Sequence, residues 1–294
     1  MIRIKNFSKS FGQLKVVDNI SFEVKKGEIF AFIGPNGAGK TTTIRCLLGI
    51  YTPTEGELLI DGEKYNPDMS SMLGYLPEDR GMYMDSKVLE TFVYFGKLKG
   101  LSQREAKERA LNYLDKVELK NKINTKINKL SSGQQQKIQI GITIINEPQL
   151  LILDEPTKGL DPVNRNLLME LLLELHKKGS TIIFSSHHLE EVEQIADRLF
   201  MIKEGKEKLY GKVNEVRKQF GTNTIKVSFK GKLPQNEKLY TATVEKNYAE
   251  ITPQEKISTT DILKFLIDKK LEISSFKTSA PSLNEIFIKI TKEN

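Results

Sequence analysis

The pattern that most constrains this chain is the stretch GPNGAGKT at residues 34–41. It matches G-x-x-x-x-G-K-[ST], which average composition would place in a chain of this length with a probability of roughly one per cent. The apolar run EIFAFI precedes it as a strand would, and TTTIRCLLGI follows it as a helix would. The alternative, a glycine-rich turn with a stray lysine, does not account for this setting. The stretch therefore predicts a phosphate-binding loop between a strand and a helix.

Each residue type in this loop has a physical role. Gly34, Gly37 and Gly39 allow successive backbone N–H groups to turn inward around phosphate oxygens, and the helix adds its positive N-terminal end. Lys40 reaches the β- and γ-phosphates, and the hydroxyl of Thr41 is a ligand for Mg²⁺. The residues expected to bind the nucleotide are Gly34, Pro35, Asn36, Gly37, Ala38, Gly39, Lys40, Thr41 and Thr42.

Two adjacent carboxylates, Asp154 and Glu155, end the apolar run in LLILDEP at residues 150–156. Asp154 suits the ligand shell of Mg²⁺, directly or through water. Glu155 can then polarise a water in line with the γ-phosphate, which is typically worth roughly 10²–10⁴-fold in rate. The alternative is a solvated strand end. Two like charges side by side, in a chain that carries a phosphate loop, favour the catalytic interpretation.

Strand-like and helix-like segments alternate through residues 1–210, which predicts a doubly wound α/β sheet with an antiparallel flank. RLFMIKEGKEKLYG is expected to form a hairpin that turns near Glu204 and Gly205. After GKVNEVRKQFGTN at residues 211–223 the pattern changes to that of a small α+β domain. Its expected strands are 224–229, 248–253 and 271–278, and its expected helices are 259–270 and 282–290. The predicted domains are therefore residues 1–218 and 219–294.

Composition limits the class of protein. With 38% hydrophobic and 28% charged residues the chain is globular, and a single cysteine, Cys46, excludes an internal disulfide. No apolar run is long enough to cross a bilayer, so we expect a protein that is soluble when isolated. The net charge is +7, and residues 211–294 hold 15 basic and 10 acidic residues. Such an excess attracts phosphates, anionic lipid or nucleic acid, or is only a solvated face.

Residues 130–146, LSSGQQQKIQIGITIIN, are ambiguous. The alternation of isoleucine in KIQIGITIIN is typical of a strand. Ile138, Ile142 and Ile145 also fall at i, i+4 and i+7, which places them on one face of a helix. Periodicity alone does not decide between these structures.

The motifs GPNGAGKT, LSSGQ, LLILDEP, GLDP and SSH, in this order, resemble those of the ATP-binding subunits of ABC transporters over residues 1–215. The resemblance implies that residues 130–146 begin a helix. It also implies that the start of this helix binds the γ-phosphate of an ATP held by a partner subunit. The residues that would act in this way are Ser131, Ser132, Gly133 and Gln134.

Further roles follow from the resemblance. Phe11 matches the aromatic residue that stacks on adenine, His187 the histidine that contacts the γ-phosphate, and Asp161 the loop that communicates across the dimer. Two positions depart from the family pattern. Ser132 replaces a glycine, which predicts altered affinity, and Glu78 replaces a glutamine, which adds a Mg²⁺-binding carboxylate but also negative charge near the triphosphate.

As a whole, the resemblance implies an ATPase that uses ATP and Mg²⁺ and works as a dimer, with itself or a homologue. A separate transmembrane permease would hold it at the cytoplasmic face of the membrane, and no nucleic acid partner is expected. A helical subdomain at about residues 80–146 would meet the permease. The C-terminal domain resembles the accessory domain of bacterial exporter ATPases, which favours export. The alternatives are a soluble ABC-type ATPase that acts on ribosomes or nucleic acid, and a nucleotide-gated regulator without catalysis.

Overall fold

The computed structural model describes residues 1–294 apart from 80, 221–223, 255–256, 280 and 293–294. The chain forms two compact units, Met1–Gly211 and Lys212–Asn294. This division lies before the boundary expected at residues 218 and 219, because helix α7 (Val213–Gln219) belongs to the second unit. Where the functional domains divide stays a prediction, for which a truncation is the test.

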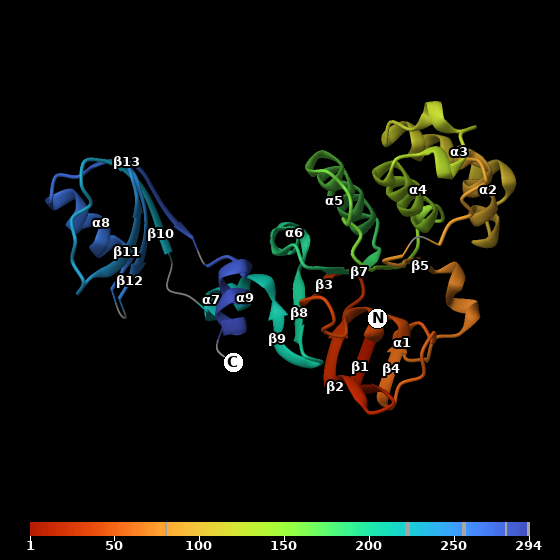
Figure 1. Ribbon diagram of the computed structural model, residues 1–294, viewed down its shortest axis with the longest axis horizontal. Coiled ribbons are helices and arrows are strands. Elements are labelled where there is room, and N and C mark those ends of the chain that lie inside the picture. The colour runs from red at the N-terminus through yellow and green to blue at the C-terminus, as the bar shows by residue number, and fades with distance from the viewer. Residues whose placement is uncertain (80, 221–223, 255–256, 280, 293–294) are drawn as a thin grey trace. The chain divides into compact units, whose positions relative to one another are not determined.

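Within the described residues of the first unit, six strands form one sheet in the order β5-β6-β7-β3-β8-β9 (Figure 1). The first five run parallel, and β8 turns into β9 through a two-residue hairpin at Glu204 and Gly205. Both hairpin residues have positive φ, 52° and 73°, as the tightest hairpin turns require. The predicted fold class and hairpin are thus confirmed. The strands are β5 (Leu73–Leu76), β6 (Leu150–Leu153), β7 (Thr181–Ser186), β3 (Ile29–Ile33), β8 (Arg198–Lys203) and β9 (Lys206–Lys212).

The order of these strands positions the site. β6, β7 and β3 are adjacent and parallel, so their carboxyl ends meet at one edge of the sheet. The phosphate-binding loop follows β3, Glu155 follows β6, and His187 follows β7. Ligands of parallel sheets bind at this edge. Three segments that are far apart in sequence therefore converge there.

An antiparallel sheet of β1 (Ile2–Phe11), β2 (Leu14–Val24) and β4 (Glu55–Ile60), in the order β2-β1-β4, packs against the larger sheet. Its Phe22 stacks on Phe30 of β3 with ring centroids 5.3 Å apart and also contacts Phe200 of β8 at 4.6 Å. Apolar side chains of α1 (Lys40–Leu47) join the same buried cluster. This shared core fixes the start of α1 against both sheets.

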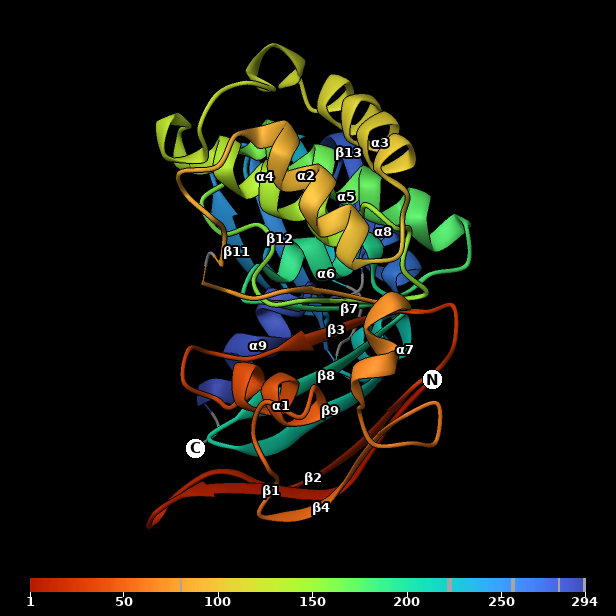
Figure 2. The same ribbon diagram turned by 90° about the vertical axis from the view of Figure 1, so that its right-hand side faces the viewer.

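The helices α2 (Val88–Leu98), α3 (Gln103–Lys116) and α4 (Ser132–Ile144) form a helical subdomain on the side of the large sheet opposite the small one (Figure 2). α4 settles the ambiguity of residues 130–146 in favour of a helix. It is buried on nearly every side, including Ile140, Thr143 and Ile144 as well as Ile138 and Ile142. An enclosed helix has no polar face, so its sequence lacks a clear helical period.

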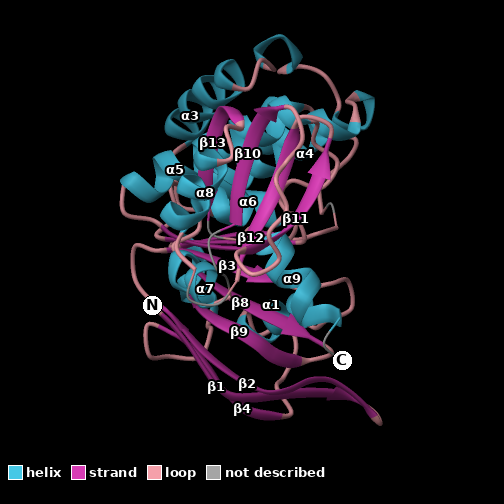
Figure 3. Cartoon of the chain, turned by 90° about the vertical axis from the view of Figure 1, so that its left-hand side faces the viewer, coloured by secondary structure: helices cyan, strands magenta, loops and turns pink. Residues whose placement is uncertain are grey.

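The second unit, taken by itself, has four strands among its described residues in the order β11-β12-β10-β13 (Figure 3). Ile262 and Leu266 of α8 pack on this sheet within one buried cluster. The three expected strands and two expected helices are confirmed, and β11 and α7 were missed. The elements are β10 (Thr224–Lys230), β11 (Tyr240–Glu245), β12 (Tyr248–Pro253), β13 (Glu272–Ser279), α8 (Thr259–Asp268) and α9 (Leu283–Lys292).

The remaining helices of the first unit are α5 (Pro162–Lys177) and α6 (Leu189–Ile195). Across the described residues of the whole chain, no helix combines the length and the apolarity that a membrane span requires.

Candidate functional site

The phosphate-binding loop occupies residues 34–39, between the end of β3 and the start of α1. A Cβ on Gly34 would lie 2.2 Å from the carbonyl oxygen of Ile202, and a Cβ on Gly39 would lie 2.9 Å from Val17 Cγ2. Gly39 also has φ 109°, which side chains disfavour. Among the described residues, no side chain caps the start of α1. Its N-terminus is therefore free to present backbone N–H groups to an anion.

The ammonium of Lys40 is enclosed by this loop. Lys40 is 5% exposed, and its Nζ donates to the carbonyl oxygens of Gly34 (2.7 Å) and Pro35 (3.3 Å). The same Nζ lies 3.5 Å from Glu155 Oε1. A cation held here can exchange these neutral partners for the oxygens of a triphosphate, which bind it more strongly.

Asp154 is 1% exposed, and its Oδ1 accepts a hydrogen bond from Ser185 Oγ at 2.6 Å. Burial raises the pKa of this carboxyl, while the hydrogen bond from Ser185 and the nearby hydroxyl of Thr41 oppose the rise. Within the described chain, its Oδ2 is buried without a hydrogen-bond partner. An unpaired carboxylate oxygen beside the Thr41 hydroxyl is suited to Mg²⁺, which prefers hard oxygen ligands. Among the described residues, no cluster of three His, Cys, Asp or Glu side chains could hold a metal.

Glu155 has φ 51°, a left-handed conformation that non-glycine residues rarely adopt and that is held here at the end of β6. Its N–H donates to Ser185 Oγ at 2.9 Å, which fixes the turn. Its Oε2 lies 2.7 Å from His187 Nδ1, and Oε1 faces Lys40. The buried carboxylate thus lies between a cation and an imidazole that is about half exposed. This arrangement could orient a water and accept its proton.

Glu78, which lines the same pocket as Thr41 and Glu155, has a cationic partner that the sequence did not reveal. Lys158 Nζ donates to Glu78 Oε1 at 2.7 Å. This hydrogen bond raises the pKa of Lys158, which keeps its ammonium charged. The negative charge expected from Glu78 near a triphosphate is therefore opposed by a cation four residues beyond Asp154.

The residues that begin α4 lie elsewhere. Ser131 caps the helix, with its Oγ accepting from the N–H of Gln134 (3.3 Å) and its own N–H donating to Gln134 Oε1 (3.0 Å). Ser131 and Ser132 are exposed, and none of the four residues 131–134 lines the pocket at the phosphate-binding loop. Within one chain, the two expected halves of the nucleotide site are thus not brought together.

Phe11 and Asp161 also lie outside this pocket. Phe11 ends β1, is 44% exposed, and contacts the ring of Tyr51 edge-on with centroids 5.4 Å apart. Asp161 caps α5, where Oδ1 accepts from the N–H of Asn164 at 3.0 Å. That hydrogen bond lowers the pKa of Asp161. Both side chains are exposed, as contact with a ligand or a second chain would require.

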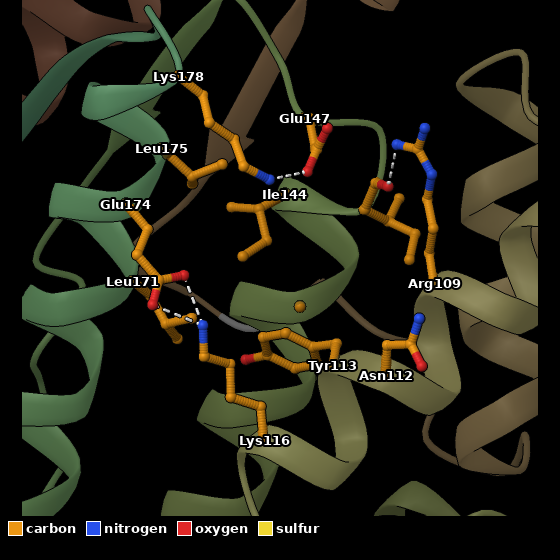
Figure 4. A pocket seen from close by; sticks show the side chains of 12 residues that line it. Arg109, Asn112, Tyr113, Lys116, Ile144, Glu147, Leu171, Glu174, Leu175 and Lys178 are labelled. Atoms are coloured by element: carbon orange, nitrogen blue, oxygen red, sulfur yellow. Dashed lines mark hydrogen bonds and ion pairs between the residues drawn. The ribbon is translucent and has the colours of Figure 1, made fainter.

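A second pocket, between α3, α4 and α5, has different chemistry (Figure 4). Its floor is apolar, and the lysines at its rim pair with carboxylates, Lys116 with Glu174 and Lys178 with Glu147. It has no glycine-rich turn at a helix start. The nucleotide chemistry is therefore concentrated at the phosphate-binding loop.

Comparison with known proteins agrees with this chemistry. Residues 17–158 match the family model described as ABC transporter, and residues 211–291 match the C-terminal domain of ATP-binding proteins like DrrA1-3. The chain is 40% identical over 271 residues to the uncharacterized ABC transporter ATP-binding protein MJ1023 of Methanocaldococcus jannaschii, covering 92% of this chain and 96% of that protein.

This chain is also similar to a component of an exporter and to a solved structure. The Nod factor export ATP-binding protein I of Cupriavidus metallidurans is 36% identical over 231 residues, covering 77% of this chain and 76% of that protein. The dimeric post-hydrolysis structure of the ATP-binding cassette MJ0796, bound to ADP and Pi, has a TM-score of 0.66 at 27% identity. It covers 72% of this chain and 99% of that one.

Proposed function

This chain belongs to the ATP-binding proteins of ABC transporters and is an ATPase, and we propose that it drives an exporter by closing on ATP as a dimer. The observation that carries the proposal is the position of Glu155, whose carboxylate lies between Lys40 in the phosphate-binding loop and His187 after β7. The sheet edge supplies a phosphate cradle and a proton acceptor at one place.

In the proposed hydrolysis, each residue acts on a part of the triphosphate. Backbone N–H groups of the loop and Lys40 hold the β- and γ-phosphates. Thr41 and Asp154 would hold Mg²⁺, which neutralises the charge that develops on the transferred phosphoryl group. Glu155 orients the attacking water and accepts its proton, and His187 holds the Glu155 carboxylate in place and contacts the γ-phosphate.

The proposed dimer follows from what one chain lacks. The start of α4 is an exposed helix N-terminus, the kind of structure that binds a phosphate, yet it lies outside its own chain's pocket. A second copy or a homologue facing the first would bring this helix start to the γ-phosphate. ATP would then hold two chains together, and hydrolysis would release them.

The permease is proposed to dock on an aromatic patch of the helical subdomain, defined as Tyr83, Met84, Tyr94 and Leu98. All four side chains are exposed, and the ring of Tyr83 contacts Tyr94 (5.7 Å) and Phe95 (6.4 Å). Exposed apolar patches mark surfaces that bind other proteins. A permease seated here would place this chain on the cytoplasmic face of the membrane.

Export is favoured over import by the names of relatives and by the second domain. The similar proteins include a Nod factor export protein and a linearmycin resistance protein of Bacillus subtilis. We assign residues 219–294 a regulatory or dimer-stabilising role. A protein that lacks residues 219–294 should bind ATP as tightly as the full chain, and loss of binding would place those residues inside the nucleotide site.

The proposal is tested by isolating the protein from its native cells in mild detergent and identifying its partners. A polytopic membrane protein without its own phosphate-binding loop is expected, and Tyr94→Glu should release it while leaving ATP hydrolysis intact. Recovery of ribosomes or nucleic acid without a permease would contradict the proposed transporter function. Absence of ATP hydrolysis in every preparation would instead favour a nucleotide-gated regulator without catalysis.

A further inference from the structure

A buried carboxylate behind the nucleotide pocket contacts both loops that carry the proposed base and histidine. Glu191 lies in the first turn of α6 and is 3% exposed. Burying a charge is unfavourable unless it is paired and hydrogen-bonded. The partners of Glu191 therefore indicate what it does.

The two oxygens of Glu191 have different partners. Oε2 accepts hydrogen bonds from Thr157 Oγ1 (3.1 Å) and Ser186 Oγ (3.0 Å), and both hydroxyls come from buried residues. Oε1 lies 3.3 Å from Nε of Arg165. Thr157 follows Glu155 by two residues, and Ser186 directly precedes His187. One carboxylate thus connects the segments that hold the proposed base and the histidine beside it.

The same contacts fix both ends of a short loop. Residues 158–161 lead from Thr157 into α5, and Arg165 lies in the first turn of that helix. Inside the loop, the N–H of Leu160 donates to the Thr157 carbonyl (3.0 Å), and the N–H of Arg165 donates to the Asp161 carbonyl (2.9 Å). A displacement of this loop therefore acts on Glu191 from two sides.

We propose that Glu191 is a positioning residue that couples the loop at residues 158–161 to His187. The proposal rests on the proposed ATPase dimer, in which Asp161 faces the second chain. Arrival of that chain sets the loop, and Glu191 transmits its position through Ser186 to His187. Hydrolysis is then fast only when the partner is in place, because a misplaced histidine no longer holds Glu155 against the water.

A purely structural role would also explain a buried carboxylate, and the chain offers a matched control. Glu190 is the neighbouring residue in the same first turn of α6, so it shares the electrostatic effect of the helix end, but it is exposed. Glu190→Gln therefore removes an equal charge without touching the two loops.

The experiment compares Glu191→Gln and Thr157→Val with Glu190→Gln in the full-length protein. It measures kcat for MgATP, the affinity for the non-hydrolysable analogue adenylyl imidodiphosphate, and the melting temperature. Glu191→Gln is expected to lower kcat about tenfold or more with analogue affinity unchanged within about twofold, since binding and positioning are separable. Thr157→Val, which removes one hydroxyl, should lower kcat by a smaller factor, and Glu190→Gln should match the wild type.

The outcomes separate the inference from the function on which it rests. A lower melting temperature with unchanged kcat in Glu191→Gln would overturn the coupling and leave Glu191 a structural residue. If that variant fails to fold, an unchanged kcat in Thr157→Val overturns it equally. A wild-type protein that binds the analogue but does not hydrolyse ATP would remove the proposed mechanism itself.

Discussion

Two helix starts in this molecule, those of α1 and α4, differ in how much of a phosphate site each one carries. The start of α1 has no side-chain cap, and Lys40, Asp154 and Glu155 are buried around it. The start of α4 is exposed and is capped by Ser131 and Gln134 of its own segment. The first is a nearly complete site, whereas the second offers only backbone and hydroxyl groups. The difference supports the proposal that α4 acts on a ligand that another chain binds.

Among the substitutions at the α1 site, Glu155→Gln tests the proposed base most directly. The amide keeps the size of the carboxylate but accepts no proton, so kcat should fall by about 10²–10⁴-fold, the usual contribution of a general base. ATP binding should persist, and ATP should then hold the dimer together long enough to be seen by light scattering. Unchanged turnover would remove Glu155 as the base.

Asp154→Asn tests the other carboxylate of the α1 site. The raised pKa of Asp154 means that the folded protein binds its proton more readily than the unfolded chain does. The ionised carboxylate therefore disfavours folding at neutral pH, and this effect fades as the pH falls towards the ordinary pKa.

The asparagine should thus abolish Mg²⁺-dependent hydrolysis and yet stabilise the nucleotide-free protein, which would raise its melting temperature. Calorimetry without nucleotide checks the second effect. A destabilised variant would show that the carboxylate is better paired than its unbonded Oδ2 indicates.

The two helix starts also differ in how far the sequence alone predicted them. The conformation of GPNGAGKT could be predicted because the strand, the glycine turn and the helix start that define it are adjacent in sequence. α4 was ambiguous, since burial on all sides removes the amphipathic period, and only the resemblance to a family identified it as a helix.

Contacts between distant segments were missed for a related reason. Lys158 and Glu78 are 80 positions apart, and Ser185 meets Asp154 across 31. The two serines at the end of the apolar run TIIFSS were a usable signal, because buried hydroxyls need partners. β11 gave little signal, since only Tyr240 among its residues is buried.

On the α4 side, Ser131→Ala should weaken the second half of the site. It removes the cap, which is worth about 1 kcal/mol of local helix stability, and the hydroxyl proposed to face the partner's γ-phosphate. Turnover should fall by roughly tenfold at protein concentrations that limit dimer formation, while nucleotide binding by a single chain stays unchanged. The neighbouring position provides a comparison, because Ser132→Gly restores the family residue and should retain turnover while changing the apparent affinity for ATP. Equal loss of single-chain binding in Ser131→Ala would place Ser131 in its own chain's site.

The smallest expected effect concerns the ion pair of Glu78 and Lys158 beside the α1 site. The test is whether a second substitution restores the KM that the first one raises. Lys158→Ala leaves Glu78 without its cation near the triphosphate, so the apparent KM for MgATP should rise about threefold, a modest change because the pair is partly exposed. Glu78→Gln removes the charge that needs a partner and should return the KM of the double variant to the wild-type value. Additive losses in the two single variants and the double variant would mean that Glu78 and Lys158 act independently. A rescued KM would instead explain how this chain carries a carboxylate where its family usually has an amide. The positive charge of Lys158, in the loop that follows the proposed base, balances the negative charge of Glu78.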